Sequence, residues 1–241
     1  MPDRGHWLAG RVAVVTGASR GIGAATAEAV AARGAHVVLA ARNTEALGEV
    51  AGRIRQAGGE ATAAPTDVSQ ARDVERLFAI AQEAGGPTAL VCAAAVLASV
   101  PFAETSLGTW QRTLGINLTG SFLCCRAAFT AMRSAGEGRI VNIASLSGVY
   151  ATEKFPGLAA YNVSKYGVIG LTEAIAVEGK EHGISAICVS PGAVDTPMLR
   201  QANPELRPGL TPDDVAELIV ALLDSPLAPA SGANIPLFSN A

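Results

Sequence analysis

Hydrophobic residues form short continuous runs along the chain, separated by longer stretches in which apolar residues recur at helical spacing. The runs occupy residues 12–15, 36–40, 61–64, 89–93, 140–143, 186–189 and 235–238. A strand that is covered on both faces needs apolar side chains on both sides, so its run is continuous rather than alternating. The pattern therefore predicts an α/β fold: a doubly wound, parallel, seven-stranded sheet with helices on both faces.

Helix signals lie between these runs. A helix is predicted at residues 24–32, and longer ones at 106–134 and 158–182. Thr211, Pro212, Asp213 and Asp214 combine a capping hydroxyl, a first-turn proline and two acids, so a helix is predicted from there to about residue 224. Pro236 cannot donate to a central ladder, which places the last run at a sheet edge. No repeat, low-complexity tract or linker divides the chain, so we expect one domain over residues 1–241.

Composition and charge exclude several classes of protein. With 49% hydrophobic and 16% charged residues, the chain has too many apolar and too few charged groups to be disordered. The 18 basic and 21 acidic residues leave a net charge of −3, which provides no broad cationic face for nucleic acid or an anionic membrane. The longest mostly apolar stretch, residues 89–100, is shorter than the ~20 residues of a spanning helix. We therefore expect neither nucleic acid nor membrane as a partner.

The first residues and the cysteines bear on the compartment. Asp3 and His6 lie where a secretory signal needs a basic start and an apolar run, so a cytoplasmic protein is expected. The four cysteines, at positions 92, 124, 125 and 188, form no CxxC pair and lie in apolar runs. We expect reduced, buried thiols and no metal site.

Glycines follow the first run, at the turn into the first helix. Gly17, Gly21 and Gly23 lack a β-carbon, and the helix start that they precede offers free N–H groups and a positive dipole end. A diphosphate could therefore bind there. The spacing is not GxGxxG, and three glycines could also form nothing more than a tight turn.

The end of the second run distinguishes the two nicotinamide cofactors. An acid there would bond a ribose 2′-hydroxyl and repel a 2′-phosphate, but this position holds Ala41, next to Arg42. Guanidinium groups match phosphate oxygens with paired donors, so Arg20 and Arg42 favour NADP(H) over NAD(H). Two solvated surface arginines are the plain alternative.

Two tyrosine–lysine pairs have the spacing of one helical turn. Tyr161 and Lys165 lie within a predicted helix, where residues four apart share a face, and a nearby ammonium can lower the pKa of a phenol. Tyr150 and Lys154 have the same spacing, but Pro156 and Gly157 end any helix there. Tyr161 is therefore the candidate acid–base group. Tyr166 is expected to pack within its helix.

Taken in order, these residues resemble the short-chain dehydrogenase/reductase family from about residue 8 to residue 232. The matching features are the glycine turn, Asn117, Ser145, the Tyr161–Lys165 pair, Pro191–Gly192 and Thr196. The pattern is nearest to the 3-oxoacyl-acyl-carrier-protein reductases. The resemblance implies a compact Rossmann-type domain and an NADP(H)-dependent oxidoreductase that interconverts a carbonyl and a secondary alcohol by hydride transfer.

The resemblance also implies a role for each site residue. Tyr161 would exchange a proton with the substrate oxygen, Ser145 would donate to the developing oxyanion, Lys165 would hold the ribose and lower the tyrosine pKa, and Asn117 would connect Lys165 to solvent. The implied cofactor contacts are Gly17, Ser19, Arg20, Gly21, Ile22, Gly23, Arg42, Asp67, Val68, Tyr161, Lys165, Pro191, Gly192 and Thr196. Turn or cap roles remain open for Ser145, Asp67 and Thr196, and an exposed helix position for Asn117.

Some segments depart from the family pattern. Cys92-Ala93-Ala94-Ala95 replaces an Asn-Asn-Ala-Gly motif, which removes two side-chain amides and puts local bracing in doubt. The segment between Ser145 and Tyr161 is longer than usual and is expected to line the substrate pocket, whereas residues 197–210 are fewer than usual and predict an open site. An NADP(H)-sensing protein without catalysis is the rival interpretation. The long helices offer apolar surface for a homodimer or a homotetramer.

Overall fold

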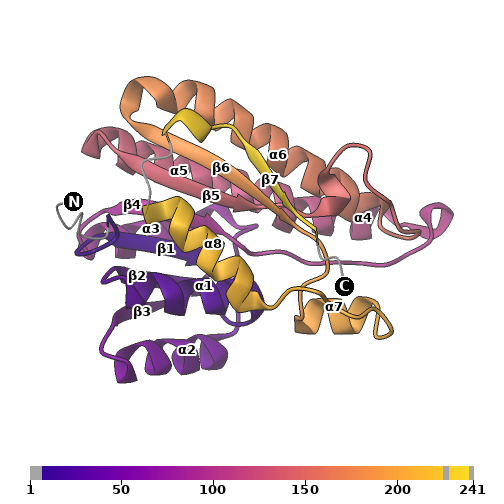
Figure 1. The fold of residues 1–241 in the computed structure, drawn as a ribbon, viewed down its shortest axis with the longest axis horizontal. Helices are drawn as coiled ribbons and strands as arrows, with labels where there is room; N and C mark the ends of the chain where they lie inside the picture. Colours follow the sequence, from indigo (N-terminus) through magenta and orange to yellow (C-terminus); the bar gives the residue numbers. More distant parts are fainter. Residues whose placement is uncertain (1–6, 225–227, 239–241) are drawn as a thin grey trace.

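The sheet has the predicted architecture. The computed structural model describes residues 7–224 and 228–238. Seven parallel strands pair in the order β3-β2-β1-β4-β5-β6-β7 (Figure 1). Their bounds are β1 Val12–Thr16, β2 His36–Ala41, β3 Glu60–Pro65, β4 Pro87–Cys92, β5 Gly138–Ile143, β6 Ile184–Pro191 and β7 Asn234–Leu237. The predicted edge position of the last strand is confirmed, because β7 pairs with β6 alone.

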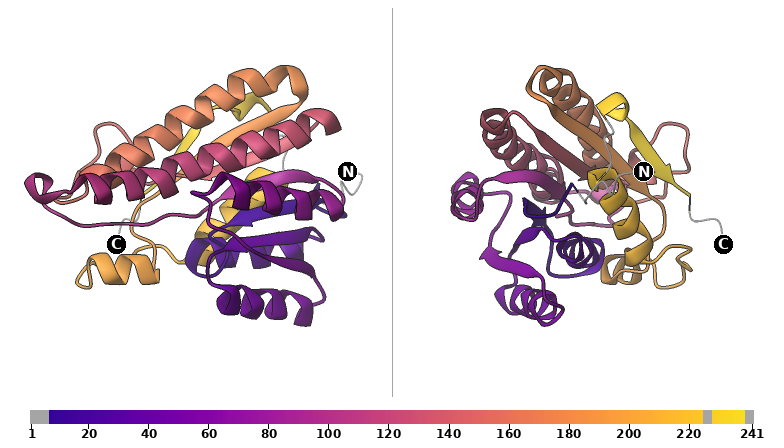
Figure 2. Two further views of the ribbon diagram at one scale, coloured as in Figure 1. Left: turned by 180° about the vertical axis from the view of Figure 1, so that it is seen from behind. Right: turned by 60° about the vertical axis from the view of Figure 1, so that its left-hand side comes forward.

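Helices cover both faces of this sheet. One face is covered by α1 (Gly21–Ala32), α2 (Thr44–Gln56) and α8 (Pro212–Asp224), and the other by α3 (Ala71–Glu83), α5 (Gly120–Ala135) and α6 (Ala159–Gly179) (Figure 2). Alternate residues of β2 enter different layers, Val37 and Leu39 on the first face and Val38 and Ala40 on the second. Both faces of the strand are therefore buried, which explains its continuous apolar run.

The remaining elements are short. Helix α4 (Leu107–Leu114) leads into α5, and α7 (Pro197–Ala202) follows β6. The 3₁₀ turns span Phe102–Glu104, Leu146–Gly148, Lys180–His182 and Ala228–Ala230. Among the described residues, no helix has the length and apolarity needed to cross a membrane, and no group of three His, Cys, Asp or Glu side chains could hold a metal ion. The four cysteines are buried and form no disulfide, as predicted.

The predicted helix over residues 106–134 has the right extent but the wrong internal geometry. Between α4 and α5 the chain forms a π turn, η2 (Gly115–Thr119), in which the N–H of Gly120 donates to the carbonyl of Gly115. A π turn widens the helix locally and changes the direction of the side chains on either side. Spacing alone predicted a uniform α-helix and could not reveal this turn.

The strand order creates the place for a ligand. The chain leaves β1 toward β2 on one side, while β4 lies directly against β1 on the other. The connections therefore diverge at this point and leave a crevice at the carboxyl ends of the two strands. The glycine turn follows β1, and the segment after β4 forms the opposite wall.

Candidate active site

A cavity of about 1300 Å³ opens at the carboxyl ends of the strands. It is lined by every residue predicted to contact a cofactor, from the glycine turn to Thr196, and also by Ser145. These residues come from the turns after β1, β2, β3, β5 and β6, from the first turn of α1, from the end of β6 and from α6. The fold thus brings together residues that are up to 179 positions apart, Gly17 and Thr196 being the two extremes.

The glycine turn packs too closely for larger residues. A β-carbon on Gly17 would lie 2.7 Å from the carbonyl carbon of Ala93, and one on Gly23 would lie 2.3 Å from the carbonyl oxygen of Gly17. Gly17 also has φ +67°, a conformation that favours glycine. Arg20 caps α1 without a side-chain hydrogen bond to its first turn. The free N–H groups at this helix start suit a diphosphate.

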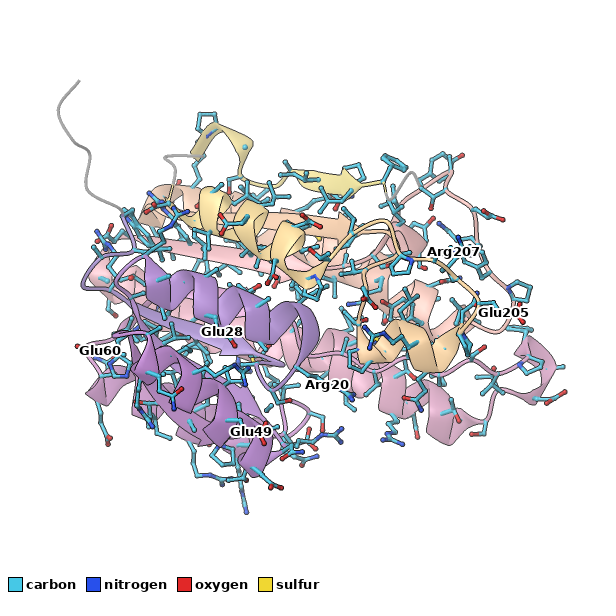
Figure 3. All side chains as sticks on the ribbon, turned by 60° about the horizontal axis from the view of Figure 1, so that its bottom comes forward. Arg20, Glu28, Glu49, Glu60, Glu205 and Arg207 are labelled. Carbon is cyan, nitrogen blue, oxygen red and sulfur yellow. The ribbon has the colours of Figure 1, made fainter. Side chains whose placement is uncertain are left out.

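Two arginines border the cavity beside this turn. Arg20 and Arg42 are exposed, and neither guanidinium pairs with an acid anywhere in the described ranges. Figure 3 shows Arg20 on the side of the glycine turn that faces α7, with Glu28 and Glu60 toward the other end of the strands. Unopposed positive charge at this point fits an additional phosphate.

A third arginine was missed by sequence reasoning. Arg112 of α4 lines an adjoining cavity of about 550 Å³ together with Arg20 and Arg42. It lies one helical turn before Ile116, which borders the main cavity. Its position one turn before Ile116 would have placed Arg112 near the crevice if Ile116 had been known to line it. Arg112 lies far from Arg20 and Arg42 in the sequence, so the cluster of three arginines could not be recognised there.

Tyr161 and Lys165 share one face of α6, as their spacing predicts. Both side chains are buried, with 9% and 3% of their surface exposed. The Lys165 ammonium Nζ lies 5.6 Å from the centre of the Tyr161 ring and donates to the carbonyl of Ile143 at 2.8 Å. The lysine is thereby fixed at the end of β5, beside the tyrosine.

Burial dominates the ionisation of both groups. It raises the pKa of Tyr161 above its ordinary value, while a hydrogen bond with Ser145 opposes the rise. Burial lowers the pKa of Lys165 to about 8, against weaker opposing effects of Cys188 and Cys92. Desolvation of the phenol therefore outweighs any effect of the ammonium, which is directed toward Ile143. That Lys165 lowers the tyrosine pKa in the cofactor complex stays a prediction.

Asn117 is a buried brace within the π turn. Its Oδ1 accepts from the N–H of Val96 at 2.8 Å, and its Nδ2 donates to the carbonyl of Val96 at 2.9 Å and to Ser164 Oγ at 3.0 Å. The alternative of an exposed helix asparagine is excluded, since 1% of its surface is exposed. Asn117 does not line the cavity. It ties the segment after β4 to α6, and so aligns one cavity wall with the helix that bears Tyr161.

Thr16 supplies the bracing that the missing amides put in doubt. Its Oγ1 accepts from the N–H groups of Ala93 and Ala94 at 3.1 and 3.2 Å and donates to the carbonyl of Val91 at 3.4 Å. Cys92 is buried, with its sulfur 3.9 Å from that of Cys125. A hydroxyl from the neighbouring strand thus holds the exit of β4, and small residues leave that wall open to a ligand.

Three predicted site residues also have local turn roles. Ser145 Oγ accepts from the N–H of Ser147, Asp67 Oδ1 accepts from the N–H and hydroxyl of Ser69, and Thr196 caps α7 by accepting from the N–H of Leu199. The alternatives left open for these positions are therefore real features of the structure. Each residue lines the cavity as well, so the turn roles position their side chains without removing them from the site.

The segment before α6 lines the cavity, as predicted, and is held by its own side chains. The Val149 carbonyl accepts from Lys154 Nζ at 2.6 Å, Thr152 Oγ1 at 3.0 Å and the Tyr166 hydroxyl at 3.1 Å. Tyr166 was expected to pack within its helix. That expectation is wrong, because the ring is 41% exposed and its hydroxyl reaches across to this loop.

Comparisons with known proteins agree with this geometry. The family profile described as short chain dehydrogenase matches residues 11–207. An uncharacterized oxidoreductase of Staphylococcus aureus is 34% identical over 220 residues, which cover 91% of this chain and 93% of that protein. The glycine betaine reductase of Emericella nidulans is 35% identical over 230 residues, but the match spans only 18% of its length.

Solved structures show the same fold. A putative gluconate dehydrogenase from Agrobacterium tumefaciens has 33% identity and a TM-score of 0.88, covering 95% of both chains. A putative NAD(P)-dependent gluconate 5-dehydrogenase from Beutenbergia cavernae, with bound NADP at low occupancy, has 32% identity and a TM-score of 0.89 over 96% of both chains. A short-chain type dehydrogenase/reductase from Mycobacterium marinum has 33% identity and a TM-score of 0.90 over 96% of this chain and 95% of that one.

Proposed function

Because the chain belongs to the short-chain dehydrogenase/reductase family, we propose that it is an NADP(H)-dependent oxidoreductase that interconverts a carbonyl group and a secondary alcohol. The observation that carries the proposal is the convergence of Tyr161, Ser145 and the glycine turn on one cavity. A proton donor beside a nucleotide-sized crevice is what carbonyl reduction needs.

The residues of the crevice fit a nicotinamide dinucleotide. The glycine turn would accommodate the diphosphate, Arg20 and Arg42 would bind a 2′-phosphate, and Asp67 and Val68 would contact the adenine; all of them line the cavity. Pro191, Gly192 and Thr196 line the same cavity and would hold the nicotinamide end. When bound in its reduced form, this cofactor supplies the hydride.

The chain's own residues then handle the proton. Tyr161 donates it to the carbonyl oxygen, and Ser145, which lines the same cavity, donates to that oxygen as negative charge develops. Lys165 of α6, whose ammonium donates to the Ile143 carbonyl, would hold the ribose. Asn117 braces the wall behind them through Val96 and Ser164. Alcohol oxidation runs through the same groups in reverse.

Cofactor choice is tested at Ala41. Replacing Ala41 with Asp places a carboxylate where it would bond a ribose 2′-hydroxyl and repel a 2′-phosphate. We expect the ratio of kcat/KM for NADPH to that for NADH to fall by about 10-fold or more, as expected for a misplaced charge worth 1–2 kcal/mol. Ala46→Asp adds the same charge at another cavity-lining position, within α2, and controls for the general effect of a new carboxylate. Its kcat/KM ratio should change less than that of Ala41→Asp. An unchanged ratio in Ala41→Asp would contradict the NADP(H) assignment.

The substrate is proposed at the level of its reacting group. The sequence pattern favours 3-oxoacyl thioesters, whereas two of the structural relatives are named gluconate dehydrogenases. A panel of ketones, 3-oxoacyl thioesters and keto sugar acids, followed by the loss of NADPH absorbance, tests the activity. A protein that binds NADPH with micromolar affinity and reduces none of these compounds would instead be the NADP(H) sensor.

A homo-oligomer in the cytoplasm completes the proposal. Phe122 of α5 and Val163 and Val177 of α6 are exposed apolar residues on two helices that cover the same sheet face. A second copy packed there would bury them. Light scattering after size-exclusion chromatography should show a dimer or tetramer, and Phe122→Glu together with Val177→Glu should shift it toward the monomer.

A further inference from the structure

The part of the cavity beyond Tyr161 is bordered by large apolar side chains that lie open to solvent. Tyr150, Phe155, Leu206 and Phe238 are 87%, 48%, 37% and 58% exposed, and all four line the cavity. They come from the loop before α6, the loop after α7 and the residue after β7, three segments that meet at the same end of the sheet (Figure 1). Apolar surface gathered from separate segments at one cavity marks a binding site for an apolar group.

Positive charge is absent from this half of the cavity within the described residues. The basic residues that line the whole cavity are Arg20 and Arg42, at the glycine turn, and Lys165, which is buried and bonded to Ile143. Of the cations nearby, Arg200 forms a salt bridge with Asp195, whereas Lys154 donates to the neutral groups of Val149 and Thr152 and keeps its charge. Arg207 follows Leu206 and is exposed. None of these three side chains lines the cavity, so a substrate carboxylate within it would contact no basic side chain at this rim.

The charged side chain that this half does present is acidic. Glu153 lines the cavity from the loop before α6, and its carboxylate would repel that of a sugar acid. The Thr152 hydroxyl lies within hydrogen-bond distance of the Val149 and Leu146 carbonyls, so its proton is used within the loop. The chain of a sugar acid could reach other polar groups of the lining, such as Ser147 and Asn203. It would gain nothing from the exposed apolar rings, because only apolar surface is stabilised by burial against them.

We infer that the substrate is an uncharged ketone, or the matching secondary alcohol, whose apolar group lies against Phe155, Leu206 and Phe238. The inference rests on the proposed function and selects within it, against the sugar acids named for two structural relatives. In the reaction the carbonyl carbon accepts a hydride, with its electron pair, from NADPH, and the carbonyl oxygen accepts the proton of Tyr161. The products are the secondary alcohol and NADP⁺, and the phenolate regains a proton from solvent.

The test is a series of methyl ketones of increasing chain length, with a keto sugar acid as the polar comparison. Each methylene that becomes buried against the apolar rim should raise kcat/KM by about threefold to fourfold until the chain extends past Phe238. Binding of the same ketones to the NADP⁺ complex, measured by ligand-observed NMR, should follow the same order. This second readout does not depend on turnover.

Three variants assign the effect to the rim. Phe155→Ser and Phe238→Ser each remove apolar surface and should reduce the gain per methylene to about twofold or less for the longer ketones. Phe102→Ser is the matched control, since Phe102 is 79% exposed and lines neither cavity. It should leave the chain-length dependence as in the wild type. All three residues are exposed, so thermal melting should confirm that the variants fold.

The outcomes separate the inference from the proposed function. A keto sugar acid reduced with higher kcat/KM than the longest ketone, or a flat chain-length dependence, would overturn the inference and leave the oxidoreductase intact. If Phe102→Ser also abolished the dependence of kcat/KM on ketone chain length, the apolar rim could not be the cause of that dependence. NADPH binding without reduction of any carbonyl compound would overturn the proposed function, and the inference with it.

Discussion

Two regions of this protein contain the same spacing, a tyrosine four residues before a lysine, and fold differently. Tyr161 and Lys165 lie on α6 with their side chains buried at the cavity. Tyr150 lies in the preceding loop with 87% of its surface exposed, and Lys154 turns back to donate to Val149 and Thr152. The comparison teaches that the spacing has meaning only where the backbone is helical.

The backbone explains the difference. Ala151 has φ +58°, a left-handed conformation in which a helix cannot continue, and Phe155-Pro156-Gly157 follows before α6 begins. In the loop pair, Lys154 holds the loop and Tyr150 borders the cavity, whereas both members of the helix pair are buried side chains of the cavity wall. We therefore expect Tyr161 and Lys165 to govern the chemistry, and Tyr150 and Lys154 to govern the shape of the substrate-binding part of the cavity.

The largest contrast is expected from removing each phenol. Tyr161→Phe should lower kcat by about 10² to 10⁴, the usual contribution of a general acid, and leave NADPH binding nearly intact. Tyr150→Phe keeps the ring, and its hydroxyl is exposed, so kcat should stay within about threefold. Steady-state kinetics with NADPH titration measure both. A Tyr161→Phe enzyme at wild-type speed would refute the assignment.

The two lysines should differ in the parameter that they change. Lys165→Met removes a buried donor to Ile143 and the proposed ribose contact, so kcat/KM should fall by about 10- to 100-fold, as for a lost charged hydrogen bond. Lys154→Met loosens the loop and should raise the substrate KM about two- to fivefold with little change in kcat. If both variants gave the same pattern, the distinction between the pairs would be wrong.

The pH dependence should follow the helix pair. Burial raises the pKa of Tyr161, so its phenol is protonated at neutral pH. Reduction uses this protonated form and should be flat from about pH 6 to 7, then fall as Lys165, whose pKa burial lowers to about 8, loses its proton. Oxidation uses the phenolate, whose fraction rises up to about tenfold per pH unit below the pKa of Tyr161. Oxidation should therefore accelerate with rising pH. Rate profiles in both directions test this, and an oxidation rate that falls as pH rises would contradict it.

The smallest effect is expected at the contact between the two regions. Tyr166 of α6 donates its hydroxyl to the Val149 carbonyl, which also accepts from Lys154. Tyr166→Phe removes one partly exposed hydrogen bond of about 0.5–1.5 kcal/mol. The substrate KM should rise about two- to threefold, and the melting temperature should fall by a few degrees at most. A change in kcat as large as that of Tyr161→Phe would show that the loop takes part in the chemistry.

The sequence predicted more of the cofactor half than of the substrate half. The strands, the turn with Gly17, Gly21 and Gly23, and the helix of Tyr161 and Lys165 all follow from local spacing and turn chemistry. The roles of Thr16 and Arg112 did not. Thr16 replaces missing amides from the neighbouring strand, and Arg112 joins its cluster from a helix 70 positions after Arg42.

Sequence alone determined the strands, the glycine turn into α1 and the helix of Tyr161 and Lys165, because hydrophobic period, capping and glycine conformation act over a few residues. Tertiary structure decided that burial raises the pKa of Tyr161, that Lys165 is directed to Ile143, and that Phe155, Leu206 and Phe238 border one cavity. Those features depend on which distant segments meet at the carboxyl ends of the strands. They arise from solvent exclusion and from contacts between distant segments, and neither leaves a repeating pattern in the sequence that could be recognised locally.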